Sequence, residues 1–139
     1  MNKERDLRSA LELLENMPGQ LIETDVEVDP MAELSGVYRH VGAGGTVQRP
    51  TKEGPAMIFN NVKGHPDSRV AIGVLASRER VAALLDSRPE DLGHLLRDSA
   101  DHPIEPVLTE EKPACQEVIH YASEEDFDLY KLIPAPTNT

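Results

Sequence analysis

Ile22-Glu-Thr-Asp-Val-Glu-Val-Asp-Pro30 is the stretch that most directly indicates the fold, because a strand pattern passes in it straight into a helix start. Ile22, Val26 and Val28 fall on one face of an extended chain, and acidic residues occupy the other face. This alternation predicts a half-buried strand over residues 22–28. Asp29 is a favourable N-cap and Pro30 suits the first helical position, so a helix is expected to follow at once.

Apolar spacing extends this pattern in both directions along the chain. Residues 5–16 predict an amphipathic helix, and Gly42 marks the end of the helix that starts at Pro30. Residues 56–62 predict a second strand, and Val70 to Leu75 is so apolar that it predicts a central strand buried on both faces. The expected apolar helix positions are Leu7, Ala10, Leu11 and Leu14, then Met31, Leu34, Val37, Tyr38 and Val41.

Two further helices are expected in the second half. Ser77 can cap the first of them, and Ser87 with Glu90 fits a capping box for the second. Their apolar positions are Val81, Leu84 and Leu85, then Leu92, Leu95 and Leu96. The expected fold class is therefore α+β, with a mixed sheet of three or four strands and about four packed helices.

The C-terminal part predicts less regular structure. Residues 101–113 suggest an extended connector, and residues 118–121 suggest a short strand. Residues 126–133 suggest a short helix whose Phe127, Leu129 and Leu132 point inward. Pro134 to Thr139 shows neither a cap nor a core element, so it is interpreted as a linker.

Composition narrows the function classes. The chain has 139 residues and a formal net charge of −11, which disfavours nucleic acid and anionic membranes as partners. No apolar run approaches the roughly 20 residues of a membrane span. Cys115 is the only cysteine, which excludes an internal disulfide and favours a reducing cytoplasm.

Local motifs supply no catalytic, cofactor-binding or metal-binding residues. The glycines of residues 42–45 follow a helix instead of opening one, which favours a helix C-cap and turn over a phosphate cradle. No two of the histidines have the spacing of a helical metal pair. Cys115 with His120 matches no nucleophile signature, and a buried structural role is expected for a lone cysteine. The histidines are His40, His65, His94, His102 and His120.

Longer motifs do carry a resemblance, which covers essentially the whole chain in order. They are Asp6-Leu7-Arg8, Val28-Asp29-Pro30, Gly54-Pro55-Ala56, Phe59-Asn60-Asn61, Lys63-Gly64, Ala76-Ser77-Arg78, Arg80-Val81, Pro113-Ala-Cys-Gln-Glu117 and Asp126-Phe-Asp-Leu129. Together they resemble the N-terminal domain of the large subunits of bacterial hydroxyarylic acid decarboxylases, within the UbiD family.

This resemblance implies a carboxy-lyase of aromatic compound catabolism that removes CO2 from gallate, protocatechuate or 4-hydroxybenzoate without oxidation. It implies prenylated FMN with manganese and potassium, held in a split-barrel domain that would lie beyond Thr139. It also implies a cytoplasmic homo-oligomer, small accessory subunits and a flavin prenyltransferase. Residues 1–112 would form the N-terminal α/β domain and residues 113–139 the connector into the flavin domain.

Two functional hypotheses follow. In the first, the chain is a fragment of such a decarboxylase and is inactive alone, since the family's catalytic, cofactor and metal residues would all lie outside it. In the second, it is a stand-alone non-catalytic interaction module, or a remnant derived from that domain.

Overall fold

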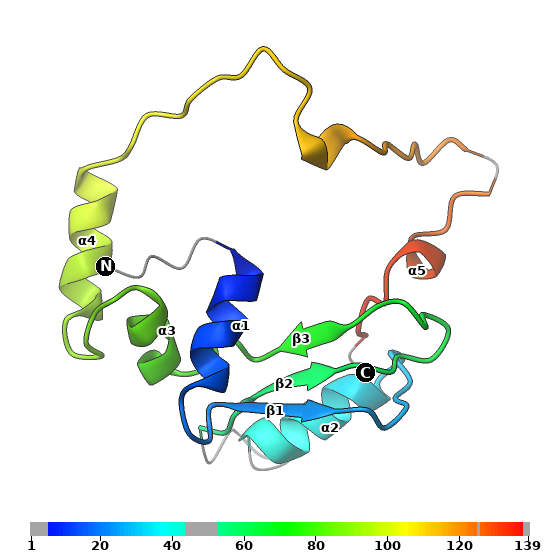
Figure 1. The fold of residues 1–139 in the computed structure, drawn as a ribbon, viewed down its shortest axis with the longest axis horizontal. Helices are drawn as coiled ribbons and strands as arrows, with labels where there is room; N and C mark the ends of the chain where they lie inside the picture. Colours follow the sequence, from blue (N-terminus) through cyan, green and yellow to red (C-terminus); the bar gives the residue numbers. More distant parts are fainter. Residues whose placement is uncertain (1–5, 44–52, 125, 138–139) are drawn as a thin grey trace.

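The computed structural model describes residues 6–43, 53–124 and 126–137, which form an α+β fold (Figure 1). The predicted fold class is confirmed, with five α-helices and one mixed sheet of three strands in the described part. The elements are α1 (Leu7–Glu15), β1 (Leu21–Thr24), α2 (Glu33–Ala43), β2 (Ala56–Phe59), β3 (Val70–Ile72), α3 (Arg78–Leu84), α4 (Leu92–Asp101), the 3-10 helix η1 (Ala114–Gln116) and α5 (Leu129–Leu132). In these described ranges no helix has the length and apolar content needed to cross a membrane.

The sheet has the order β1-β2-β3. β1 runs parallel to β2, with Leu21 beside Ala56, and β3 runs antiparallel to β2, with Ile72 beside Met57. β2 pairs with both other strands and is therefore the central strand, and all four of its residues are buried. The prediction of a central strand at residues 70–75 is wrong: β3 is a half-buried edge strand, and the left-handed backbone of Gly73 (φ +76°) ends it.

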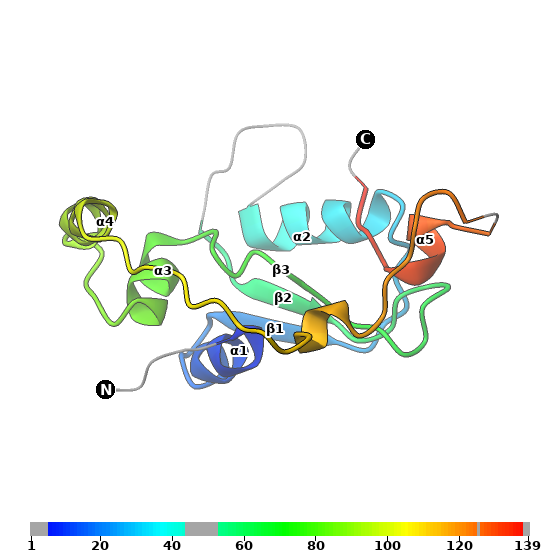
Figure 2. The same ribbon diagram turned by 90° about the horizontal axis from the view of Figure 1, so that it is seen from above.

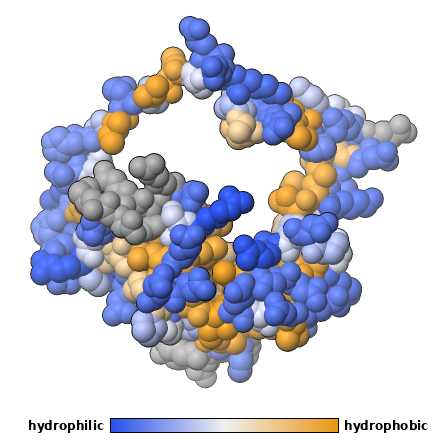
Figure 3. Space-filling view, in the orientation of Figure 1, coloured by the Kyte–Doolittle hydropathy of each residue, from blue (hydrophilic) through white to orange (hydrophobic). Residues whose placement is uncertain are grey.

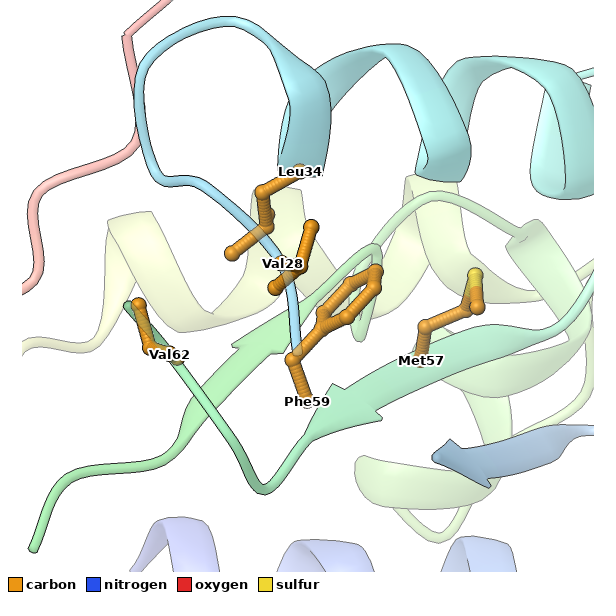
Figure 4. Packing of buried hydrophobic residues seen from close by; sticks show 5 residues of the cluster. All are labelled: Val28, Leu34, Met57, Phe59 and Val62. Atoms are coloured by element: carbon orange, nitrogen blue, oxygen red, sulfur yellow. The ribbon is translucent and has the colours of Figure 1, made fainter. Parts of the chain in front are cut away.

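The main core lies between α2 and one face of the sheet (Figure 4). Phe59 and Met57 project from β2 toward Leu34 of α2. Val28 and Val62 close the cluster beyond the strand ends, where they form an isolated parallel bridge. Tyr38 and Val41 were expected on the apolar stripe of this helix and do pack against the core, whereas Met31 and Val37 are exposed.

Helices α1 and α2 lie on opposite faces of the sheet (Figure 2). Asp6 caps α1 by accepting a 2.9 Å hydrogen bond from the Ser9 N–H, a cap that the sequence pattern did not single out. Leu14 is the fully buried member of the predicted α1 stripe. Leu7, at the other end of the helix, is largely exposed.

The predicted strand at residues 22–28 is only partly correct. Regular pairing ends at Thr24, and the chain is bent at Asp25 to Val28 before it bridges Val62. As a result Val28 is buried, but Ile22 is exposed and Val26 has 74% of its surface exposed. The prediction that these three residues share a buried face is therefore wrong for two of them.

Helix α2 starts later than Asp29-Pro30 predicts. Ala32 has a positive φ of 68°, which interrupts the chain before Glu33. The Glu33 carboxylate reaches back to accept a 2.7 Å hydrogen bond from the Asp29 N–H. Asp29 therefore stabilises the turn that precedes the helix, and it is not the helix N-cap.

The two later helices differ in how they begin. Ser77 caps α3 as predicted, with its hydroxyl accepting from the Glu79 N–H. The capping box of Ser87 and Glu90 is wrong: α4 begins after Asp91, and the Glu90 carboxylate lies 3.6 Å from the Arg88 guanidinium instead. Leu92 anchors α4 in the core, while Leu96 is exposed.

Residues 103–124 and 126–136 belong to an arm that leaves the globular part after α4 and returns to it near α2 (Figure 1). The extended connector is confirmed, but residues 118–121 form no strand. The short helix α5 is present, although Leu129 and Leu132 are exposed and do not point inward. Within the segment interpreted as a linker, Thr137 forms a parallel bridge with Met31.

Candidate functional site

A polar cluster lies where the two parallel strands end. Because β1 and β2 run in the same direction, the residues that follow them, Asp25 and Asn60, lie at one edge of the sheet. The Asn60 side-chain amide donates to Asp25 Oδ1 over 2.9 Å, and the Asn61 amide donates to the Asp25 carbonyl over 3.3 Å. Ligands of open α/β sheets bind at the carboxyl ends of the strands, so this edge is the first candidate site.

An ion pair stands beside this cluster. Lys63 Nζ lies 2.9 Å from Asp29 Oδ2, and Asp29 Oδ1 accepts a 2.9 Å hydrogen bond from the Met31 N–H. The hydrogen bond from Lys63 lowers the pKa of Asp29 below its ordinary value. The same bond raises the pKa of Lys63. A carboxylate held in this way is a weak base, so the pair fixes the turn before α2 and is poorly suited to proton transfer.

Asn60 carries an unusual oxygen. Within the described part of the chain, its Oδ1 is the buried side-chain oxygen or nitrogen that lacks a hydrogen-bond partner. Exchanging the amide oxygen and nitrogen would satisfy nothing, because the nitrogen already donates to Asp25. The cluster as a whole therefore locks the strand ends together and presents no nucleophile.

The most buried polar side chain belongs to Arg80 of α3, which is 1% exposed. Its guanidinium donates to the carbonyls of Gly73 (3.1 Å), Val74 (3.3 Å) and Gly54 (2.8 Å), and to Gln20 Oε1 (2.9 Å). These four acceptors are uncharged and come from three separate segments. Arg80 therefore joins the chain before β1, before β2 and after β3, and it presents nothing to a substrate.

A groove of about 430 Å³ runs between α1 and the sheet. Arg8, Glu12 and Glu15 of α1 line one side, and Glu23 and Arg69 line the other. Arg69 lies 3.6 Å from Glu23 with both side chains exposed, so much of their charge is already paired across the groove. The groove can accept a small polar molecule, but its charges do not converge on one point.

Gly42, the described member of the glycine-rich stretch, serves packing at the end of α2. Gly42 lies buried beneath Tyr38, and its carbonyl accepts a 2.7 Å hydrogen bond from the Gly54 N–H. This contact supports the interpretation of a helix end, whereas Gly44 and Gly45 lie outside the described residues.

The histidines and the cysteine do not converge. His40, His94, His102 and His120 are exposed, and His65 forms a bridge with Val62. Cys115 lies exposed in η1, so the expectation that it is buried is wrong. His120 lies 3.5 Å from the Glu124 carboxylate. The described ranges contain no group of three or more histidine, cysteine, aspartate or glutamate side chains that could hold a metal ion.

Two features of the site were missed in the sequence. The Arg80 network could have been suspected from spacing, since Arg80 falls on the same helical face as Ser77 and Leu84, where an apolar residue is expected. The pairing of Asp25 with Asn60 joins positions 35 residues apart, and no local pattern predicts it.

Comparison with known proteins gives one consistent result. Residues 11–99 match the family model described as the 3-octaprenyl-4-hydroxybenzoate carboxy-lyase N-terminal domain, UbiD_N. The chain is 53% identical to the gallate decarboxylase of Lactiplantibacillus plantarum over 135 residues, which are 96% of this chain and 28% of that protein.

Solved structures agree with this match. The apo 3,4-dihydroxybenzoic acid decarboxylase of Enterobacter cloacae superposes with a TM-score of 0.83 at 55% identity, covering 99% of this chain and 28% of that one. An evolved dimeric form of the UbiD-class enzyme HmfF from Pelotomaculum thermopropionicum, in complex with prFMN, superposes with a TM-score of 0.71 at 27% identity, covering 96% and 28%. The chain thus spans 28% of the length of each of these relatives.

The described residues do not fit a flavin and metal centre. They offer no group of three or more metal-ligating side chains, and the guanidinium of Arg80 already donates four hydrogen bonds to uncharged acceptors. The paired side chains of Asp25, Asn60, Asp29 and Lys63 are likewise engaged with one another. These residues are therefore assigned a structural role and no catalytic one.

Proposed function

Because the chain belongs to the UbiD family of 3-octaprenyl-4-hydroxybenzoate carboxy-lyases, we propose that it serves as the N-terminal domain of a hydroxyarylic acid decarboxylase. The enzyme would convert gallate, protocatechuate or 4-hydroxybenzoate into the corresponding phenol and CO2 without oxidation. The observation that carries this proposal is the higher sequence identity of the chain to decarboxylases of hydroxybenzoic acids than to another UbiD-class enzyme. The chain is 53% and 55% identical to a gallate and a 3,4-dihydroxybenzoic acid decarboxylase along nearly its whole length, but 27% identical to HmfF.

The chemistry of the reaction supports a division of labour between domains. Loss of CO2 from an aryl carboxylate leaves an electron pair on the ring carbon, and ordinary side chains cannot delocalise it, so a cofactor must accept it. Prenylated FMN, with manganese and potassium, would supply that electron sink. Since the described residues fit no such centre, we place the cofactor and the catalytic groups in sequence outside this chain and expect the chain alone to be inactive.

The remaining parts of the proposal concern organisation. Residues 1–112 would form the N-terminal domain, and residues 113–139 would connect it to the flavin domain. The complete enzyme would be a cytoplasmic homo-oligomer that depends on a flavin prenyltransferase and works with small accessory subunits. The structure of a dimeric HmfF form supports oligomerisation within the family.

A fusion tests the proposal. This chain would replace the aligned 28% of the Enterobacter cloacae enzyme, and the fusion would be produced together with a flavin prenyltransferase. Catechol release from protocatechuate and pyrogallol release from gallate would be measured by chromatography. We expect the fusion to release at least one phenol and this chain alone to release none.

Two controls give the experiment its meaning. Omitting the prenyltransferase should abolish the activity of the fusion, because the unmodified flavin lacks the required reactivity. A folded, flavin-loaded fusion that is inactive on every hydroxybenzoate would favour the alternative of a non-catalytic interaction module. Phenol release by this chain alone would overturn the proposed division of labour.

A further inference from the structure

The arm is attached to the globular part of the domain at both of its ends. It leaves the globular part after α4 and returns at Thr137, whose N–H donates to the Pro30 carbonyl over 3.0 Å. The Thr137 carbonyl in turn accepts from the Ala32 N–H over 3.2 Å. Between these attachments the arm stands away from the sheet, and the opening that it borders persists in the space-filling view (Figure 3).

The arm carries hydrophobic side chains that the described residues leave exposed. Ile104, Val107 and Leu108 are 96%, 94% and 92% exposed. The part of the arm that returns toward α2, its second limb, also exposes hydrophobic residues. Hydrophobic residues border the opening on this limb and on the first limb, which leaves α4 (Figure 3). The exposed aliphatic residues of the second limb are Val118, Ile119, Leu129, Leu132 and Ile133. An extended apolar surface of this kind marks an interface, because exposing it to water is unfavourable.

The relatives indicate what covers it. The superposition on the Enterobacter cloacae enzyme spans 99% of this chain, so it includes the arm, at a TM-score of 0.83. In that protein the aligned region is 28% of the chain, so most of the polypeptide is available to pack against the arm. The near-complete exposure of Ile104, Val107 and Leu108 in this chain is explained if the rest of the subunit packs against them.

The charge of the arm favours the rest of the same subunit, and not a second copy of this chain, as the partner that covers its hydrophobic residues. Lys112 and Lys131 are the only lysines or arginines of the arm, and Glu105, Glu110 and Glu117 lie exposed along it. A second copy would bring another chain of net charge −11 against this acidic surface, which like-charge repulsion disfavours. The surface instead fits a partner that presents basic residues around an apolar patch.

We propose that residues 103–124 and 126–136 are a clasp that holds the downstream domain of the same decarboxylase subunit through an apolar patch ringed by basic residues. This inference rests on the proposed function and adds the contact by which the N-terminal domain is joined to its neighbour. Ile104, Val107 and Leu108 form the apolar centre of the clasp, and the glutamates form its rim.

Hydrogen exchange tests the clasp in two molecules, the free chain and the fusion described above. Backbone amides of residues 104, 105 and 107–111 should exchange at least tenfold more slowly in the fusion than in the free chain. The triple variant Ile104→Asp, Val107→Asp, Leu108→Asp should lose this protection and lower the melting temperature of the fusion. In the free chain the same variant should leave the melting temperature unchanged, because these side chains are almost fully exposed there. The matched control is Val26→Asp, an exposed valine after the opposite edge strand, which should change neither quantity.

The outcomes separate this inference from the proposed function. An active fusion whose arm exchanges as fast as in the free chain overturns the clasp and leaves the function intact. An inactive fusion whose arm is protected overturns the function and leaves the clasp intact. A fusion in which this N-terminal domain is folded but the downstream domains are not counts against the clasp. Protection that appears in the free chain and rises with its concentration would assign the surface to a second copy and overturn the proposal.

Discussion

Arg80 Nη1 lies 2.9 Å from Gln20 Oε1, although 60 residues separate the two along the chain. The same nitrogen also donates to the Gly54 carbonyl, so one atom joins the turn before β1 to the segment before β2. The guanidinium has exchanged water for protein carbonyls at 1% exposure, and each of those carbonyls would otherwise be buried with one fewer donor. Arg80 therefore acts as the polar centre of the fold.

Replacing Arg80 with methionine should strongly destabilise the chain. The aliphatic side chain fills much of the space but leaves several buried carbonyls without a donor, and each costs about 1–3 kcal/mol. We expect a loss of roughly 3–5 kcal/mol in the free energy of unfolding, measured by urea denaturation. Gln20→Ala should cost only about 1 kcal/mol, because Nη1 keeps its bond to Gly54.

The matched control for this series is Arg97→Met on α4. Arg97 is exposed, so its replacement should change the free energy of unfolding by less than about 0.5 kcal/mol. Equal stability of the Arg80 and Arg97 variants would show that the four hydrogen bonds contribute nothing net.

A paired substitution tests which strand is central. Met57 of β2 and Ile72 of β3 are register partners, but Met57 is 4% exposed and Ile72 is half-buried at the sheet edge. Met57→Asp should cost roughly 3–5 kcal/mol or prevent folding, because it buries an unpaired charge. Ile72→Asp should cost about 1–2 kcal/mol, since the carboxylate can turn toward water. Thermal melts of both variants provide the comparison, and a more severe effect at Ile72 would contradict the sheet order.

The sequence correctly predicts features that depend on neighbouring residues. It does not predict features that depend on contacts between distant parts of the chain. Ser77 was correctly placed as a cap because a hydroxyl and the N–H two residues later determine that structure together. Val70 to Leu75 was misplaced as a central strand because an apolar run records burial but not strand order. β2 became central through its pairing with both neighbours, which a single strand pattern does not encode.

The polar sites show the same limit. The prediction that Asp29 is a helix N-cap is wrong because the positive φ of Ala32 interrupts the chain between Asp29 and the helix. The backbone of Ala32 is held by Thr137, more than 100 residues away. Arg80 escaped notice because a charged residue in a helix is ordinarily assigned to a solvated face.

Two glycines with similar positive φ angles allow the cost of backbone strain to be separated from the cost of a side-chain collision. Gly19 (φ +74°) has open space where a Cβ would lie, whereas a Cβ on Gly73 (φ +76°) would collide with the Tyr38 ring. Gly19→Ala should therefore cost only the left-handed backbone penalty of about 1–2 kcal/mol. Gly73→Ala should cost more by at least about 1 kcal/mol, because Tyr38 must also leave its place on the core.

A double-mutant cycle checks the assigned cause. Adding Tyr38→Ala to Gly73→Ala should recover the collision part of the loss, giving a coupling free energy of about 1 kcal/mol between the two sites. Additive effects in urea denaturation would show that the ring is not the obstacle.

The ion pair of Asp29 and Lys63 should be visible as two displaced titrations. The bond to Lys63 holds the pKa of Asp29 below its ordinary 3.8, so the stability from this carboxylate is full above that value and is lost as pH falls through the lowered pKa. The pKa of Lys63 is raised above 10.5, so its contribution is full below that value and is lost as pH rises through the raised pKa. Lys63→Met should move the pKa of Asp29 upward, measured from the carboxyl carbon shift by NMR titration. Lys112→Met on the arm should leave it in place, and an unchanged Asp29 titration in the Lys63 variant would rule out Lys63 as the cause.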